Sequence, residues 1–193
     1  MISENVAVTV AHNVYDIERG IWASDIKAWP GRNGNTFPYG GPYEVTYMTM
    51  CSTYPSGVTG SDWALIAFNT DIGSSTGVID FTYFSDTTLN GIALRIAGYE
   101  QDEDILDIGG YYYASFLYQM IGNLSSFTSA ILRYQVDTEE GQSGSPVMGL
   151  GYVAFGIHYG GYTDASDPYN EGIRITQGIY NVFHACIAEQ ALS

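Results

Sequence analysis

Three stretches far apart in the chain hold the residue types that hydroxyl-based nucleophilic chemistry requires. The turn "GQSGSP" at 141–146 contains Ser143, His12 follows the alternating run "NVAVTVA", and Asp62 opens the apolar run "DWALIAF". A serine hydroxyl is a poor nucleophile at neutral pH. It is activated when a neutral imidazole takes its proton and a carboxylate orients that imidazole. The sequence therefore supplies each residue type that such a site needs.

Each of these residues also has an ordinary structural explanation. Gly141 and Gly144 suit a tight turn of any purpose, although they would also point the Ser143 hydroxyl outward and let backbone N–H groups converge. A histidine at a strand end, such as His12, is usually structural. Asp62 is placed where it could simply cap a loop. Taken one at a time, these residues leave the choice between a turn and a nucleophile open.

The elements that must position these residues are short strands. Runs of about strand length, rich in apolar and β-branched residues, recur at 5–10, 44–50, 62–68, 77–84, 91–99, 130–136 and 152–160. Their spacing predicts a β-sandwich or β-barrel. The segment 176–193 differs because Ile179, Val182, Phe183, Cys186 and Ile187 recur at helical spacing. It predicts one amphipathic C-terminal helix.

The composition excludes several classes of function. The chain has 21 Asp and Glu residues against 6 Lys and Arg, a net charge of −15, which repels phosphate backbones and anionic lipid. We therefore expect neither nucleic acid nor a membrane as a partner. No apolar run is long enough to span a membrane, and residues 1–12 lack the features of a signal peptide. No zinc-ligand spacing or phosphate loop occurs, so we expect no metal and no organic cofactor.

Read together in the order His, Asp, Ser, the segments "VTVAHNVYD", "GSDWALIAFNTDIG" and "GQSGSPV" resemble the chymotrypsin-like serine proteases. More narrowly, the chain is similar to the bacterial glutamyl endopeptidases of the V8 and Bacillus type. The segments "KAWPGRNG", "YPSG", "IAGYEQDE" and "FGIHYGG" fall where that branch has matching segments. The resemblance thus covers nearly the whole chain.

The resemblance implies a role for each catalytic residue. His12 corresponds to the general base, Asp62 to the carboxylate that orients it, and Ser143 to the nucleophile. The backbone N–H groups of Gly141 and Ser143 correspond to the oxyanion hole, which stabilises the negative charge that develops on the substrate carbonyl oxygen.

The resemblance also implies a substrate site. Tyr159, Gly160 and Gly161 correspond to a strand edge that pairs with the substrate main chain by β-augmentation. His158 and Thr138 correspond to residues that hold the glutamate side chain in glutamyl endopeptidases, by hydrogen bonds or through a protonated imidazole. His158 alone would also fit a hydrogen-bonded core histidine, but the surrounding "GIHYGG" favours the pocket role.

Three acidic residues weigh against a preference for glutamate. Asp137 lies six residues before Ser143, where trypsin-like enzymes keep the acid that binds Lys or Arg, and Glu139 and Glu140 follow closely. Their charges would repel an anionic side chain unless water or a cation screens them. A preference other than glutamate, including a basic one, therefore stays open.

The chain departs from the family at its start and in its cysteines. Only eleven residues precede His12, so we expect a six-stranded N-terminal barrel to lack about two strands, with exposed edges and an incomplete core. A fragment, a shortened enzyme and an inactive relative would each fit. Asn13 stands where many relatives have a cysteine. Cys51 and Cys186 are too few for a disulfide framework, and one bridge or two free thiols remain possible.

The expected fold is all-β, with two antiparallel β-barrels of the trypsin-like serine protease type and a C-terminal helix. With a boundary between Phe84 and Ile92, residues 1–85 would form the incomplete barrel, and residues 86–193 would form the second barrel, the nucleophile and the specificity pocket. The resemblance implies a secreted, monomeric serine endopeptidase. It would hydrolyse peptides or proteins through an acyl-enzyme after Glu or Asp at P1, the residue before the cleaved bond. The alternatives are another P1 preference or a catalytically inactive binding protein of the same fold.

Overall fold

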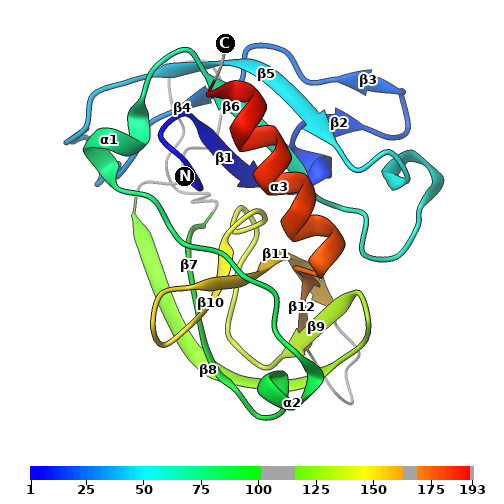
Figure 1. Cartoon of the computed structure of the whole chain (residues 1–193). Helices are drawn as coiled ribbons and strands as arrows, with labels where there is room; N and C mark the ends of the chain where they lie inside the picture. The colour runs from blue at the N-terminus through cyan, green and yellow to red at the C-terminus, as the bar shows by residue number, and fades with distance from the viewer. Residues whose placement is uncertain (101–115, 163–168, 192–193) are drawn as a thin grey trace.

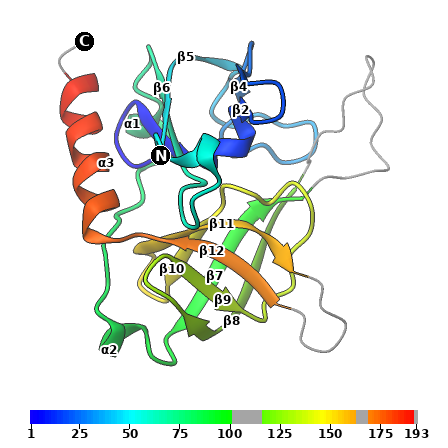
Figure 2. The same cartoon turned by 90° about the vertical axis from the view of Figure 1, so that its right-hand side faces the viewer.

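The computed structural model describes residues 1–100, 116–162 and 169–191, which form two β-rich halves and a C-terminal helix (Figures 1 and 2). The first half is a four-stranded antiparallel sheet in the order β1-β6-β5-β4, with a small hairpin, β2–β3. The second half is a closed antiparallel barrel in the order β10-β11-β12-β9-β8-β7. The architecture is therefore mostly β, with one open half and one closed half, as the sequence predicts.

The bounds of the elements are as follows. In the first half, the strands are β1 (Val6–Thr9), β2 (Tyr15–Asp16), β3 (Ile21–Trp22), β4 (Lys27–Ala28), β5 (Tyr43–Met50) and β6 (Ala64–Phe68). In the barrel, they are β7 (Ala93–Tyr99), β8 (Leu117–Phe127), β9 (Ile131–Tyr134), β10 (Pro146–Gly149), β11 (Ala154–Tyr162) and β12 (Tyr169–Arg174). The helices are η1 (Ala11–Asn13), η2 (Tyr54–Ser56), α1 (Ile72–Thr76), α2 (Asp86–Leu89) and α3 (Gln177–Gln190).

The barrel closes around strands whose side chains alternate between core and surface. In β7, Leu94 and Ile96 are fully buried while their neighbours are partly exposed, which is the period of two expected for a strand with one face inside. Tyr134 from β9 and Phe155 from β11 fill the same core. This packed interior gives the loops at the barrel rim a rigid base.

A second core joins the two halves. Val6 and Leu65 from the sheet pack in one cluster with Ile157 and Ile173 from the barrel and with Phe183 from α3. Strand β6 is therefore covered on both faces, and its sequence "ALIAF" is nearly continuously buried. The joint core fixes the sheet half, which carries one part of the candidate site, against the barrel, which carries the other.

The C-terminal helix α3 forms where the sequence predicts it. The Thr176 side chain accepts a hydrogen bond from the backbone N–H of residue 179 and so caps the first turn. Phe183 and Cys186 are buried as expected, whereas Val182 is 44% exposed and does not belong to the buried face. The Phe183 ring contacts the Trp63 ring edge-on, with 5.5 Å between the ring centroids. Trp63 is the residue directly after Asp62.

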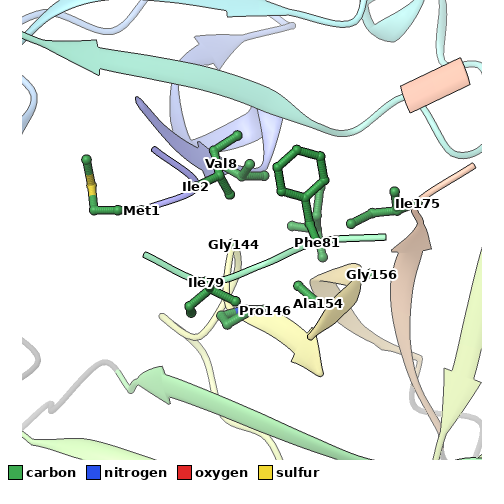
Figure 3. A pocket seen from close by; sticks show the side chains of 11 residues that line it. Met1, Ile2, Val8, Ile79, Phe81, Gly144, Pro146, Ala154, Gly156 and Ile175 are labelled. Carbon is green, nitrogen blue, oxygen red and sulfur yellow. The ribbon is translucent and has the colours of Figure 1, made fainter. Parts of the chain in front are cut away.

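A small apolar hollow of about 70 Å³ lies in the seam between the halves (Figure 3). Val8 and Phe81 line it together with Pro146, Ala154 and Ile175. Phe81 makes an isolated bridge to Ala154, and the described connection from 77 to 84 is otherwise not a strand. The predicted strand at 77–84 is therefore wrong, because its apolar residues cover the seam instead of pairing in a sheet.

The predictions for the other strands, the cysteines, a membrane-spanning helix and the domain boundary have different outcomes. Strands β1, β6, β7 and β9 fall within predicted runs, and β5 and β11 overlap theirs but extend one and two residues beyond them. Strands β8, β10, β12 and the short strands β2 to β4 were not predicted. Cys51 and Cys186 are both free thiols, which decides the open question of a bridge. The described residues contain no helix that is long and apolar enough to cross a membrane. The domain division at 85/86 stays a prediction.

Candidate active site

His12 and Asp62 meet at the edge of the sheet half. His12 lies in the one-turn helix η1 that follows β1, and Asp62 lies just before β6, which pairs with β1. The His12 backbone N–H donates to Asp62 Oδ1 at 3.0 Å, and His12 Nδ1 lies 2.7 Å from Asp62 Oδ2. One carboxylate therefore holds both the backbone and the ring of the histidine. The other ring nitrogen, Nε2, has no hydrogen-bond partner among the described residues, and the His12 side chain is 38% exposed.

Ser143 lies in a tight turn between β9 and β10. Two backbone hydrogen bonds shape the turn, from Gln142 N to Glu139 O at 3.3 Å and from Ser145 N to Gln142 O at 3.0 Å. Gly144 has φ +94°, a conformation that residues with a Cβ rarely adopt. A Cβ at this position would also lie 2.6 Å from Thr9 Oγ1 in β1. The turn thus packs directly against the strand that leads to His12.

The structure brings Ser143 next to the His12 segment without a hydrogen bond between the two side chains. Asn13 Nδ2 donates to the Ser143 backbone oxygen at 3.1 Å and to Thr9 Oγ1 at 3.0 Å, which ties η1 to the serine turn. Ser143 Oγ itself donates to the backbone oxygen of Tyr159 at 3.2 Å. Sequence reasoning noted Asn13 only as a missing cysteine, although its position beside His12 was the available signal.

The serine turn itself contains two backbone N–H groups that could serve as donors. Gly141, at φ +90°, and Ser143 are the residues predicted to supply oxyanion-hole N–H groups. Neither N–H has a hydrogen-bond acceptor among the described residues. Unpaired backbone N–H groups at an accessible turn are available to an incoming oxygen atom.

Residues Tyr159, Gly160 and Gly161 form the edge that the sequence predicts. Before them, β11 is tied to the serine turn by hydrogen bonds from Gly144 N to His158 O and from His158 N to Ser145 O, both 2.8 Å. From Tyr159 onward, β11 pairs with β12 on one side, and no described strand pairs with it on the other. The free side starts beside Ser143, because the Ser143 hydroxyl reaches the Tyr159 carbonyl.

His158 is a buried and uncharged histidine. Only 2% of it is exposed, and its Nδ1 lies 2.8 Å from the Tyr134 hydroxyl inside the barrel. Loss of hydration on burial lowers the pKa of His158 to about 4, with a smaller opposing effect from a hydrogen bond to the Glu171 backbone. At neutral pH the ring can therefore act through hydrogen bonds and not through a charge. Nothing in the sequence marked Tyr134 as its partner.

The other pocket residues lie on the segment that leads into the serine turn. Thr138 is half-buried and makes no hydrogen bond to His158 in the described structure, so this pair is not joined directly. Asp137, Glu139 and Glu140 are exposed, where water and salt weaken their charges.

Asn170 on β12 is a residue near the predicted substrate edge that the sequence did not single out. Its side chain donates to the Val136 backbone oxygen at 2.5 Å. It also lies so close to Gly161 that a Cβ there would be 2.5 Å from Asn170 Oδ1. Asn170 thus links the free edge of β11 to the segment that carries Thr138.

Tyr159 is held by a partly exposed charge pair that the sequence also did not reveal. Its hydroxyl donates to Glu171 Oε2, and Glu171 Oε1 accepts from Arg133 Nε at 2.7 Å. Burial, and then the hydrogen bond and charge of Glu171, raise the pKa of Tyr159. Glu171 lies on β12, a strand that is not among the runs predicted from the sequence.

Comparison with solved structures identifies the fold. A structure of a Glu endopeptidase in complex with MPD superposes with a TM-score of 0.84 and 24% identity, covering 97% of this chain and 83% of that one. A scabies mite inactivated protease paralogue superposes with a TM-score of 0.69 and 18% identity, covering 98% of this chain and 86% of that one. Together with the architecture, these matches define the chymotrypsin-like serine protease fold.

The sequence comparisons identify the branch. A glutamyl endopeptidase of Bacillus licheniformis is 30% identical over 189 residues, which are 94% of this chain and 56% of the relative. An extracellular metalloprotease of Bacillus subtilis is 28% identical over 185 residues, which are 94% of this chain and 55% of that relative. The chain is thus a glutamyl endopeptidase homologue, which confirms the predicted resemblance. It spans about half the length of these curated relatives. No family model matches the sequence.

The second relative's name raises the question of a metal site. Among the described residues, no group of three or more His, Cys, Asp or Glu side chains is arranged to hold a metal ion. Within this part of the chain, the described side-chain contacts of the candidate site join His12 to Asp62 and the Ser143 hydroxyl to the Tyr159 backbone oxygen.

Proposed function

We propose that the chain is a serine endopeptidase that acts through an acyl-enzyme. The main support is that Asp62 makes two hydrogen bonds to His12, one of 2.7 Å to the ring and one of 3.0 Å to the backbone N–H. This pair lies next to the glycine-rich turn that contains Ser143. Asp62 keeps the proton on Nδ1, so His12 Nε2 is free to accept the proton of a hydroxyl.

The resting contact of Ser143 fits this mechanism. Its hydroxyl donates to the Tyr159 carbonyl, which is also the first acceptor that a peptide main chain would meet on the free edge of β11. A substrate N–H that bonds to this carbonyl displaces the hydroxyl, which rotates about Cα–Cβ towards His12. Substrate binding and activation of the nucleophile are thereby coupled.

The bond changes then follow in two steps. Ser143 Oγ attacks the P1 carbonyl carbon, His12 Nε2 takes the hydroxyl proton, and the oxygen that becomes negative accepts hydrogen bonds from Gly141 N and Ser143 N. The C–N bond breaks as His12 returns the proton to the leaving amine. Water, deprotonated by His12, hydrolyses the resulting ester and regenerates Ser143.

We further propose that the residue at P1 is Glu or Asp. The 30% identical relative is named a glutamyl endopeptidase, and Thr138 and His158 offer uncharged hydrogen-bonding groups near the free edge of β11. An uncharged His158 can still donate to a carboxylate. Because Asp137, Glu139 and Glu140 are exposed, their repulsion of an acidic side chain is weakened by solvent.

A catalytically silent binding protein is the second candidate. Two observations favour it: Ser143 is bonded to Tyr159 and not to His12, and the same fold occurs in an inactivated protease paralogue. Such a protein would use the free β11 edge to hold a peptide without cleaving it.

A serine-directed fluorophosphonate separates the two candidates. The enzyme should be labelled covalently at Ser143, and Ser143→Ala should abolish the labelling. Asp62→Asn should slow labelling by a factor on the order of 10³ to 10⁴, because the wrong His12 tautomer is then favoured. If the folded wild-type protein is not labelled, the protease proposal fails and the binding protein remains.

The P1 preference needs its own series of substrates. Peptides that differ only at P1, with Glu, Asp, Gln, Lys or Phe, should be cleaved fastest after Glu. His158→Gln should lower kcat/KM for the Glu peptide more than for the Phe peptide. An equal loss on both peptides would make His158 a structural residue, and faster cleavage after Lys would favour a basic preference.

We infer that the protein works outside the cell as a monomer, on peptide or protein substrates. The support is the printed name of one relative, an extracellular protease, and the strong negative charge, which disfavours association between copies. Detection in the culture medium of the source organism and light scattering of the purified protein would test these two points.

A further inference from the structure

The side chain of Asn13 connects the two halves of the molecule at the candidate site. Asn13 follows His12 directly in η1, and its Nδ2 donates to the backbone oxygen of Ser143, 130 residues later in the chain, at 3.1 Å. The same nitrogen donates to Thr9 Oγ1 at 3.0 Å, on the strand that leads into η1. Because a carboxamide NH₂ group carries two protons, it can make both bonds at once. The Asn13 side chain is therefore fixed on its own element and reaches across to the nucleophile residue.

The peptide group that Asn13 contacts is also held from the barrel. Its carbonyl oxygen belongs to Ser143, and its N–H belongs to Gly144, which donates to the His158 backbone oxygen on β11 at 2.8 Å. A peptide group is planar, so one bond at each end fixes its orientation. Since this group follows the Ser143 Cα directly, its orientation helps to determine where the Ser143 hydroxyl can point.

The relative position of His12 and Ser143 depends on contacts of this kind. No described hydrogen bond joins their side chains, since His12 bonds to Asp62 and the Ser143 hydroxyl bonds to the Tyr159 backbone oxygen. Proton transfer requires the two side chains to come within hydrogen-bond reach, about 3 Å. The bond from Asn13 joins the residue next to the histidine to the serine residue itself, and so bears directly on this distance.

The exposure of Asn13 separates its effect on catalysis from its effect on stability. Its side chain is exposed, so water competes for the bond to Ser143, and the net contribution of such a bond to folding is modest. Loss of the bond would still allow η1 and the serine turn to shift relative to each other. A misplacement of about 1 Å can slow a reaction about a hundredfold.

We propose that Asn13 is a positioning residue that holds Ser143 at the distance and angle from which His12 takes its proton. This inference rests on the proposed protease function. Asn13 acts through the Ser143 backbone and neither gives nor takes a proton. It should therefore affect the rate of the chemical step and not the binding of a peptide along β11.

The test compares Asn13→Ala with Asn5→Ala. Asn5 is a matched control because its Nδ2 also donates to a distant backbone oxygen, that of Gln190 in α3, at 3.3 Å. Asn13→Ala should lower kcat about tenfold to hundredfold and leave KM within about twofold of the wild type. Asn5→Ala should change neither value. Urea unfolding would verify that each variant is folded under the assay conditions.

A second variant, Asn13→Asp, keeps the shape of the side chain and serves if Asn13→Ala unfolds. Its carboxylate can accept a hydrogen bond from the Thr9 hydroxyl but cannot donate to the Ser143 oxygen. It should therefore lose at least as much kcat as Asn13→Ala. A folded Asn13→Asp with the kcat of the wild type would overturn the inference.

The rate of fluorophosphonate labelling gives an independent readout, because this reagent needs Ser143 and His12 but no peptide on β11. Asn13→Ala should slow labelling by about the same factor as kcat. The pH at which labelling is half-maximal should stay at its wild-type value, since both bonds of Asp62 to His12 remain. A shifted midpoint would overturn the inference, because Asn13 would then act on the protonation of His12. A loss confined to KM would overturn it as well.

Labelling of the wild type distinguishes this inference from the proposed function. If the wild type and Asn13→Ala are labelled equally fast, the positioning role is refuted and the protease function stands. If the folded wild type is not labelled at all, the proposed function itself is refuted, and the role of Asn13 falls with it.

Discussion

Gly144 is the residue on which the shape of the nucleophile turn depends most. Its φ of +94° suits glycine, and the lack of a Cβ leaves room for Thr9. The Thr9 hydroxyl in turn accepts a hydrogen bond from the Asn13 side chain. Any larger residue would push β1 and the serine turn apart. The close packing of the serine turn against the strand that leads to His12 therefore requires a residue without a Cβ at position 144.

Gly144→Ala is expected to destabilise the protein by roughly 2 kcal/mol or more and to slow fluorophosphonate labelling at least tenfold. Urea unfolding and labelling rates would measure the two effects. The matched control is Gly57→Ala, where φ is +67° and nothing lies within 4 Å, so only the backbone cost of about 1 kcal/mol applies. Equal losses in both variants would show that contact with Thr9 is unimportant.

The buried His158 makes folding stability depend on pH. Its pKa is about 4 in the folded protein and near 6.5 when unfolded, so the unfolded chain takes up the proton first as pH falls. The stability is therefore complete above pH 6.5 and is lost as pH falls towards 4. At about 1.4 kcal/mol per pH unit, the loss from this residue is about 3 kcal/mol.

This dependence can be isolated with His158→Gln, which cannot titrate but can still bond to Tyr134. The difference in unfolding free energy between wild type and variant should shift by about 3 kcal/mol in the variant's favour between pH 7 and pH 4. A difference that stays constant over this range would mean that His158 is as easily protonated when folded as when unfolded.

At the scale of elements, α3 holds the two halves together. Phe183 belongs to the core that includes β1, β6, β11 and β12, and Thr176 caps the helix start. The helix lies alongside the sheet half and joins the barrel at its lower end (Figure 2). Weakening it should loosen the seam on which both parts of the site rest.

Phe183→Ala should cost about 3 to 5 kcal/mol of stability, since a fully buried ring leaves a cavity. Thr176→Ala should cost about 1 kcal/mol through loss of the cap. Chemical unfolding followed by circular dichroism would measure both. The exposed Val182→Ala on the same helix is the control, with an expected effect within about 0.5 kcal/mol.

Whether a strand could be predicted from the sequence depended on how regularly its apolar residues are spaced. In runs such as "ALIAF" and "ALRIAGY", the apolar residues occupy the positions that are buried in the structure, so these strands were predicted from the sequence. Strand β8 is mostly exposed along its length, and β12 contains Asn, Glu and Gly, so neither has a clear apolar period. The catalytic triad candidates were found because motifs identified them. Tyr134, Glu171 and Asn170 contact His158, Tyr159 and the Gly161 edge, and these contacts depend on the register between distant strands, which local sequence does not encode.

For the whole molecule, the dominant property is a net charge of −15. Acidic side chains outnumber basic ones 21 to 6, so an acidic substrate approaches a repulsive field. The ion pair of Arg133 and Glu171 is partly exposed, but its partners lie 2.7 Å apart, so salt screens it less than the repulsion between more distant surface charges. Salt should therefore affect substrate encounter more than the internal geometry of the site.

Raising the ionic strength from about 0.01 M to about 0.2 M should lower KM several-fold for a peptide with Glu at P1 and leave kcat nearly unchanged. The control peptide has Gln at the same position and should respond less. Steady-state kinetics at constant pH would measure both. A KM that rises with salt would instead indicate attraction between the acidic peptide and a positive group in the pocket.

The free side of β11 also carries a risk for the protein. No described strand pairs with this side of β11, and exposed backbone N–H and C=O groups can accept an extended strand, including one from another copy of the same chain. The proposed peptide site would have to stay open while copies of the protein stay apart, and the mutual repulsion of their acidic surfaces favours that separation. Acid that neutralises the carboxylates removes this protection, so solubility and an open binding edge depend on the same charges.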